Sequence, residues 1–388
     1  MNDNVGINEK EHDERLSVLT STPKLVTLGT HNSCNAKCVF CLEGAYPRFT
    51  LERYKEFFEG RMGRFIRQAE KVTFTGFGEV LLVPDALAFL DYVNDTIPDI
   101  WKIFTTNGTP LTEDVISRLL KSRYVVQLSL HAADAKRHEE LTLLKGAYPG
   151  IIESARKICR LRRERDLGDR LHMVLVNVVT RKSVDGMADI VRLAWDLQVP
   201  EVRFNYVTMF SPDHIAQSCF FEQERANRAI DAAREELRTI EVEADPEEFK
   251  YFQVRLPEKF GESSGELRGG GHCADPWQHV YVESQGPVLP CCNWGVHAGN
   301  LEKGDSIDGL WNGEFYRSLR RSMGSDTPHP WCAHCVNYRG YNVDSLLCHL
   351  TNRPDQQRKL LREIERRGAA DVSGYLTAVG EAEKCVPC

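Results

Sequence analysis

The chain has 388 residues and a formal net charge of −7, with 27% charged and 42% hydrophobic residues. This composition is typical of a globular protein with a sizeable core, and an acidic balance without a long Lys/Arg stripe argues against a general nucleic-acid binder. No apolar run approaches the roughly 18 residues of a membrane span, and the N-terminus lacks the apolar core of a signal peptide. We therefore expect a cytoplasmic protein that binds neither nucleic acid nor membrane.

From Pro23 to about Val207, short β-rich runs alternate with amphipathic stretches. The predicted strands are 24–30, 71–76, 101–108, 124–131, 172–179 and 201–207, and the predicted helices between them are 51–69, 84–93, 112–121, 150–166 and 185–197. The strand runs are interpreted as apolar on both faces, which favours a parallel sheet covered by crossover helices. We expect an α/β open or partial barrel over residues 23–215, with ligands bound where the strands end.

The segments around this barrel are less regular. We expect a flexible N-terminus over 1–22 and, over 216–265, a charged helix (220–239) and a linker that the glycine-rich run 262–272 closes. A small C-terminal α+β domain then spans 266–348, with a hairpin whose turn is Ser284 to Pro287 and a helix that Ser306 caps. The last part, 349–388, holds a predicted helix (354–368), and its final segment EKCVPC (383–388) is expected to be mobile.

Thirteen cysteines need an explanation other than disulfides, because a reducing cytosol favours metal ligation or catalysis. Cys34, Cys38 and Cys41 follow the first strand directly, with the spacing C-x3-C-x2-C. Three thiolates on one loop can hold three corners of a four-iron cluster and leave one iron open. A structural zinc site, with His31 as a fourth ligand, is the alternative.

With the aromatic Phe40 before the third cysteine, this loop resembles the signature of the radical S-adenosylmethionine (SAM) enzyme family, and the resemblance covers roughly residues 24 to 210. It implies a partial (βα)6 TIM-like barrel, a 4Fe-4S cluster, SAM as cofactor and a 5'-deoxyadenosyl radical. It also implies an external one-electron donor such as flavodoxin or ferredoxin.

Further positions resemble the family's SAM-binding elements. TGFGE (75–79) is similar to its glycine-glycine-glutamate element, and a carboxylate suits the SAM amino group. The ends of strands three and four match positions that contact the SAM carboxylate or ribose, although turn or capping roles are equally open there. The candidate SAM-binding residues are Phe40, Gly76, Gly78, Glu79, Thr106, Asn107, Ser129, Asn177 and Arg181.

A second group of cysteines lies in the C-terminal module. Cys273, Cys291, Cys332 and Cys335 supply four thiolates, enough to saturate a second 4Fe-4S cluster. The arrangement resembles the SPASM/twitch family, and the single-cluster twitch form fits better because only Cys348 follows nearby. Whether Cys292 or Cys348 is a ligand stays open, and a zinc ribbon is the alternative. Another C-x2-C, Cys385 and Cys388, is interpreted as a redox dithiol or an unstructured tail.

A radical SAM barrel with an auxiliary cluster implies an oxidoreductase that abstracts a hydrogen atom and passes the remaining electron to that cluster. The first hypothesis is a dehydrogenase acting on a small polar natural product such as an aminocyclitol or aminoglycoside, whose amines Glu43 or Asp134 would pair with. Peptide or protein maturation (cross-linking, epimerisation or formylglycine formation) is the second. The 33 residues before Cys34 are too few for a peptide-recognition domain, which favours the small molecule. A non-catalytic metal-binding scaffold is the third.

Overall fold

The computed structural model describes residues 3–29, 33–41, 50–76, 78–82, 85–261, 273–292, 297–325, 327, 329, 332, 335, 341–350 and 353–384. Ten strands form one sheet in the order β10-β9-β8-β1-β2-β3-β4-β5-β6-β7. The strands are β1 (Leu25–Gly29), β2 (Lys71–Thr75), β3 (Trp101–Thr106), β4 (Tyr124–Ser129), β5 (Leu171–Val179), β6 (Glu201–Tyr206), β7 (Gln253–Arg255), β8 (His279–Val282), β9 (Pro287–Leu289) and β10 (Gly299–Asn300). The six predicted barrel strands are confirmed as β1 to β6.

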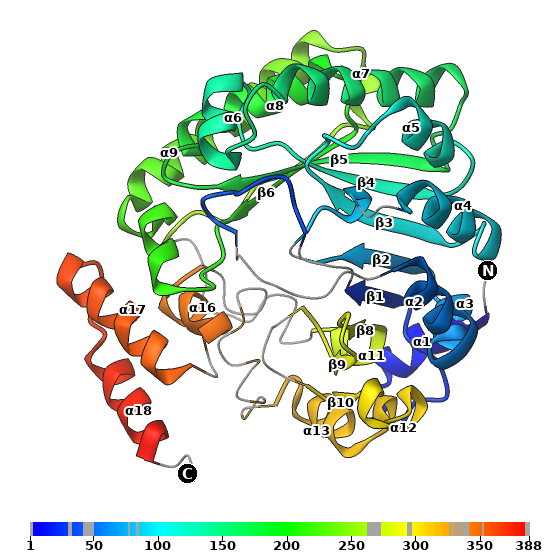
Figure 1. The fold of residues 1–388 in the computed structure, drawn as a ribbon. Helices are drawn as coiled ribbons and strands as arrows, with labels where there is room; N and C mark the ends of the chain where they lie inside the picture. The colour runs from blue at the N-terminus through cyan, green and yellow to red at the C-terminus, as the bar shows by residue number, and fades with distance from the viewer. Residues whose placement is uncertain are drawn as a thin grey trace.

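The helices cover the convex side of the curved sheet, where α4, α5, α7, α8 and α9 follow its arc (Figure 1). The barrel helices are α2 (Leu51–Glu56), α3 (Gly63–Gln68), α4 (Ala86–Thr96), α5 (Glu113–Leu119), α6 (Ala135–Thr142), α7 (Tyr148–Glu164), α8 (Met187–Asp196), α9 (Gln223–Glu243) and α10 (Pro246–Phe249). The five predicted barrel helices are confirmed, with a π-helical turn dividing the first into α2 and α3. Outside the barrel lie α1 (Asp3–Asp13), α11 (Asp275–Gln278), α12 (Ile307–Trp311), α13 (Glu314–Ser322), α16 (Val343–Leu347), α17 (Pro354–Arg367) and α18 (Ser373–Lys384). Among the described helices, none is long and apolar enough to cross a membrane.

The two faces of the sheet differ in character. A paired row across its convex face consists of Leu28, Phe74, Phe104, Val126 and Met173, each at most 2% exposed. Residues of the opposite, concave face are partly exposed, so burial alternates along β2, β3 and β4. The strands are therefore not apolar on both faces as expected, because their concave face lines a cavity instead of packing against a further layer.

The C-terminal hairpin belongs to this same sheet. Strand β8 pairs in parallel with β1, and β9 pairs antiparallel with β8, as the predicted hairpin requires. The turn contains Gly286, whose φ of +92° favours glycine. Strand β7 lies in the segment expected to be a helix and linker, and it pairs with β6. The glycine-rich run 262–272 lies outside the described residues, and the domain boundaries stay a prediction.

The predicted caps and helices of the C-terminal half are present. Ser306 caps α12 by accepting from the Gly309 backbone N–H at 3.2 Å, and α17 (Pro354–Arg367) matches the helix predicted at 354–368. Where a flexible N-terminus was expected, the chain forms α1, which packs beside α11. Asn8 donates to the Trp277 carbonyl at 2.8 Å, and the Trp277 indole donates to the Leu16 carbonyl at 2.8 Å. The N-terminal segment is thus tied to the C-terminal module.

Candidate active site

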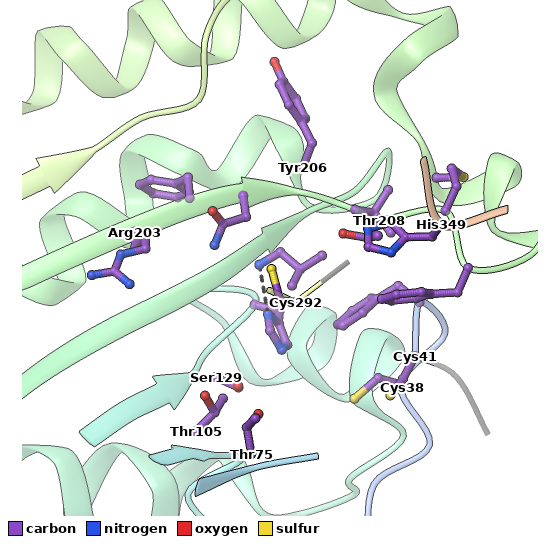
Figure 2. Close-up of a pocket in the computed structure, with 18 of the residues that line it drawn as sticks. Cys38, Cys41, Thr75, Thr105, Ser129, Arg203, Tyr206, Thr208, Cys292 and His349 are labelled. Atoms are coloured by element: carbon purple, nitrogen blue, oxygen red, sulfur yellow. Dashed lines mark hydrogen bonds between the residues drawn. The ribbon is translucent and has the colours of Figure 1, made fainter. Parts of the chain in front are cut away.

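A cavity of about 860 Å³ opens at the carboxyl ends of the barrel strands. Figure 2 shows Thr75, Thr105 and Ser129 together where β2, β3 and β4 end, with Cys38 and Cys41 beside each other at the cavity wall. The predicted site residues among its lining are Cys34, Cys38, Phe40, Cys41, Gly76, Gly78, Glu79, Thr106, Asn107 and Ser129. The fold therefore gathers both cysteine-loop and strand-end predictions around one space.

The cysteine loop is held by backbone hydrogen bonds to the end of α6. The Lys37 and Val39 N–H groups donate to the carbonyls of Thr142 and Leu141 at 3.0 and 2.9 Å. Burial, followed by the charges of Cys41 and Cys34, raises the pKa of the Cys38 thiol to about 12. A cationic iron-sulfur core would offset the cost of ionising this thiol, so the three sulfurs of the loop suit it as ligands.

Two neighbours complete the loop's environment. The Phe40 ring meets the His131 ring edge-on, with centroids 4.9 Å apart. The Asn107 side chain donates to Asn35 Oδ1 at 2.7 Å and lies 3.8 Å from the Cys34 sulfur. Asn107 therefore joins the end of β3 to the cysteine loop.

Glu79 is a buried carboxyl group, 2% exposed, that faces the cavity. Its Oε2 accepts from the Asn107 N–H at 2.6 Å and its Oε1 from the Leu81 N–H at 3.4 Å. Desolvation outweighs these bonds and raises the pKa of Glu79 to about 7. A carboxylate held this way gains from a cationic or hydrogen-donating ligand, so its surroundings fit the SAM amino group.

Of the other strand-end residues, Thr106 and Asn107 stabilise a turn, whereas Ser129 can bind a ligand. The Thr106 hydroxyl accepts from the Gly108 N–H at 3.1 Å, and Asn107 Oδ1 accepts from the Thr109 N–H at 3.0 Å, so both stabilise the turn after β3. The Ser129 side chain has no hydrogen-bond partner among the described residues, although it lines the cavity. Its hydroxyl is free to meet a ligand.

Asn177 and Arg181 are not brought to the described cavity lining. Asn177 is 2% exposed and donates to the Leu130 carbonyl at 3.0 Å, which ties β5 to β4. Arg181 forms an ion pair with Glu222, its Nε donating at 2.7 Å. Asp134, expected near the mouth, caps α6 instead by accepting from the Arg137 N–H at 2.9 Å. Glu43, His31, Cys385 and Cys388 lie outside the described residues.

One residue of the second cysteine group, Cys292, lines the cavity that also holds the cysteine loop. Burial raises the pKa values of Cys273 and Cys332, and the charges of Asp275 and Cys335 raise both further. The charge of Cys335 also contributes to the raised pKa of Cys292, which lines the cavity. The charge of Cys291 acts instead on the pKa of Tyr316. Cys348 is buried. Among the described residues, no three His, Cys, Asp or Glu side chains gather closely enough to hold a single metal ion.

The lining residues that sequence reasoning missed include two histidines and two arginines, His131, His349, Arg203 and Arg255. The Val178 N–H donates to His131 Nδ1 at 3.2 Å, so the neutral ring carries its proton on Nε2. The alternation E-V-R-F-N-Y in β6 was a usable signal for Arg203, because it places every second, polar residue on one face. Arg255 had no such signal, since β7 has three residues.

Comparison with known proteins identifies two domains. Residues 29–194 match the Radical SAM superfamily, and residues 273–336 match SPASM, an iron-sulfur cluster-binding domain. An AdoMet-dependent heme synthase of Methanosarcina barkeri (strain Fusaro / DSM 804) is 22% identical over 323 residues, which cover 78% of this chain and 86% of the relative.

Solved structures share the fold at lower identity. Streptococcus suis SuiB bound to precursor peptide SuiA matches with a TM-score of 0.60 and 15% identity, over 85% of this chain and 73% of SuiB. Native anSMEcpe with bound AdoMet matches with a TM-score of 0.55 and 15% identity, over 88% of this chain and 98% of its own. The mostly parallel α/β fold with a C-terminal module is common to all three.

Proposed function

Because the chain belongs to the radical SAM superfamily and carries a SPASM domain, we propose that it is an oxidoreductase that acts on a small polar substrate bound in the 860 Å³ cavity. The substrate loses one hydrogen atom, and then a proton and an electron, so that it is oxidised by two electrons. One observation carries the proposal. The cysteine loop, the buried Glu79 and Cys292 of the C-terminal module all line the same cavity.

The residues present fit the implied cofactors. Cys34, Cys38 and Cys41 would hold one 4Fe-4S cluster, and Glu79 would accept hydrogen bonds from the SAM amino group. When bound, the cluster and SAM supply one-electron cleavage of SAM to the 5'-deoxyadenosyl radical, with the electron drawn from an external donor such as flavodoxin or ferredoxin.

The chain's own contribution is positioning and exclusion of water. The aromatic rings of Phe40, Phe210 and Tyr341 line the cavity. Ser129 offers a free hydroxyl, and Asn107 fixes the turn after β3 against the cysteine loop. These groups would hold the ligands in one orientation and keep the reactive intermediate away from solvent.

The second cluster is proposed to accept the electron left on the substrate. Cys273, Cys332 and Cys335 would be three of its ligands, with Cys291 or Cys292 as the fourth. The position of Cys292 on the cavity wall supports electron transfer from a substrate held there, because a cluster that includes Cys292 or its neighbour lies next to the cavity.

The cavity volume favours a small molecule. It lies within the roughly 300–1,000 Å³ of typical small-ligand sites, and it has to hold SAM as well. An aminocyclitol or aminoglycoside is the class that the family resemblance first suggested. Peptide maturation is the second candidate function, and the similarity to SuiB, solved with its precursor peptide, is the observation that favours it.

The test is anaerobic reconstitution with iron counting and detection of 5'-deoxyadenosine after addition of dithionite. The wild type is expected to hold about eight irons, and Cys34→Ala and Cys332→Ala about four each. Cys34→Ala should form no 5'-deoxyadenosine, whereas Cys332→Ala should still form it. Cys159→Ala is the matched control, because this thiol is 1% exposed and packs in the barrel core. A wild-type count near four would refute the two-cluster proposal, and absence of SAM cleavage by the wild type would refute the function.

A further inference from the structure

A charged cluster lies on the concave face of β6 and β7. Ser129 at the end of β4 pairs with Val176, Val176 with Arg203 on β6, and Arg203 with Arg255 on β7. Residues paired across one row of a sheet point to the same face. Ser129, Arg203 and Arg255 all line the cavity, so the two arginines stand at the same level as the strand-end hydroxyl.

One carboxylate holds both guanidinium groups. Glu201 Oε1 accepts from Arg203 Nη2 at 2.7 Å and pairs with Arg255 Nε at 2.9 Å, while Glu201 Oε2 lies 3.0 Å from His172 Nε2. The His172 hydrogen bond first, and then Arg203 and Arg255, lower the pKa of Glu201 to about 2. Two cations therefore share a single anion, and a positive charge is left over.

The arginines remain accessible although Glu201 is not. The Glu201 side chain is 7% exposed, but those of Arg203 and Arg255 are 31% and 61% exposed. The buried Nε of Arg203 has no hydrogen-bond partner in the described part of the chain. The guanidinium groups are thus fixed in place by Glu201 and still have donors to offer.

The described lining has two carboxylate residues. Glu79 lies next to the cysteine loop, and Glu258 is an exposed residue three positions after Arg255. Figure 2 shows Arg203 on the opposite side of the cavity from Cys38 and Cys41. One end of the cavity therefore suits an amino group and the other an anion.

We propose that Arg203 and Arg255 form an anion-binding subsite that holds a carboxylate or phosphate group of the substrate, at the end of the cavity away from the cysteine loop. The planar fork of a guanidinium matches both groups with paired, charge-assisted hydrogen bonds. The inference rests on the proposed function and narrows its substrate class. An acid-bearing small molecule is favoured over a purely cationic aminocyclitol or aminoglycoside.

The test is calorimetric titration of the reconstituted, SAM-saturated holoenzyme with succinate and with inorganic phosphate, at constant ionic strength. Saturable binding is expected, weakened at least about tenfold in Arg203→Gln and in Arg255→Gln, because each removes a charge-assisted contact. Arg203→Lys should lie between wild type and Arg203→Gln. Arg238→Gln is the control, since Arg238 is exposed on α9 and pairs with Glu235. Tighter binding of succinate would assign a carboxylate to the subsite, and tighter binding of phosphate a phosphate.

Three results would overturn the subsite. These are no saturable binding of either anion to the wild type, unchanged binding in both glutamine variants, or weaker binding of SAM itself in those variants, which would assign the arginines to the SAM carboxylate. Arg255→Gln decides the matter if Arg203→Gln fails to retain iron, because Arg255 is on an exposed edge strand. SAM cleavage is measured separately. A wild type that binds the anions but never cleaves SAM contradicts the proposed function and leaves the subsite standing.

Discussion

Replacing Glu79 by glutamine tests whether this buried carboxylate binds the SAM amino group. Burial raises its pKa from 4.5 to about 7, despite the hydrogen bonds from Asn107 and Leu81. At about 1.4 kcal/mol per pH unit, this corresponds to about 3 kcal/mol in favour of the protonated form. The folded pKa lies above the unfolded value, so the cost of ionising Glu79 is absent below pH 4.5, grows between pH 4.5 and 7, and is fully present above pH 7. A ligand amino group offsets that cost, and SAM should bind the ionised form more tightly.

With a pKa of about 7, roughly a tenth of Glu79 is ionised at pH 6 and roughly nine tenths at pH 8, so this group alone should strengthen SAM binding about tenfold between the two. The amino group of SAM titrates near pH 8 as well. The informative quantity is therefore the ratio of SAM dissociation constants, Glu79→Gln over wild type, measured by anaerobic equilibrium dialysis at both pH values. The ratio should be about tenfold larger at pH 8. An equal ratio at pH 6 and pH 8 would refute the assignment.

Three further predictions concern the scaffold. Gly108→Ala should lower the unfolding free energy by about 2 kcal/mol or more and weaken SAM binding, because φ is +84° and a Cβ would lie 2.7 Å from Leu128. The control is Gly146→Ala, where φ is +68° but the space around the Cβ is open. Equal losses of unfolding free energy for the two variants in urea titrations would contradict the steric argument. Asn312→Ala should cost about 2 kcal/mol, because its side chain bonds both the N–H and the carbonyl of Leu19, at 2.9 and 2.8 Å; an unchanged thermal midpoint would show that this tie contributes nothing. Gly29→Ala should accelerate amide hydrogen exchange in β8 but not in β5, since a Cβ would lie 3.0 Å from the Glu283 Cα. The same acceleration over wild type in both strands would exclude a local effect.

The barrel and its cysteine loop were predictable because their signals are local. Strand residues such as Val72 and Phe74 alternate with polar ones over five residues, and the C-x3-C-x2-C spacing follows the first strand directly. Helix α1 was not predictable, because the side chains that it buries are Asn4, Asn8 and Glu11. Polar residues at helical spacing look like a solvated segment. Here they are buried because partners distant in sequence satisfy them, as when Glu11 accepts from Ser21.

The charged part of the site was hidden for a related reason. Strand β6 was interpreted as apolar on both faces, yet Glu201 and Arg203 lie on its concave face. The burial of Glu201 is possible because Arg203 and Arg255 pair with it, and Arg255 comes from a strand of three residues. Asp134 was predicted to pair with a substrate amine, but it caps α6. A carboxylate at the start of a helix commonly accepts from the backbone N–H three residues later, and the Arg137 N–H is that donor here.

The C-terminal module contacts both edges of the open barrel. The barrel is open, with β1 at one edge and β6 and β7 at the other. The module joins the first edge through the pairing of β8 with β1. It reaches the second through Tyr341, whose hydroxyl donates to the Val207 carbonyl at 3.2 Å and whose ring stacks on Tyr206 at 4.5 Å. Figure 1 shows β8 and β9 beside β1. The segment that carries the second cysteine group therefore also shields the cavity, so the barrel alone would leave a radical intermediate exposed to water.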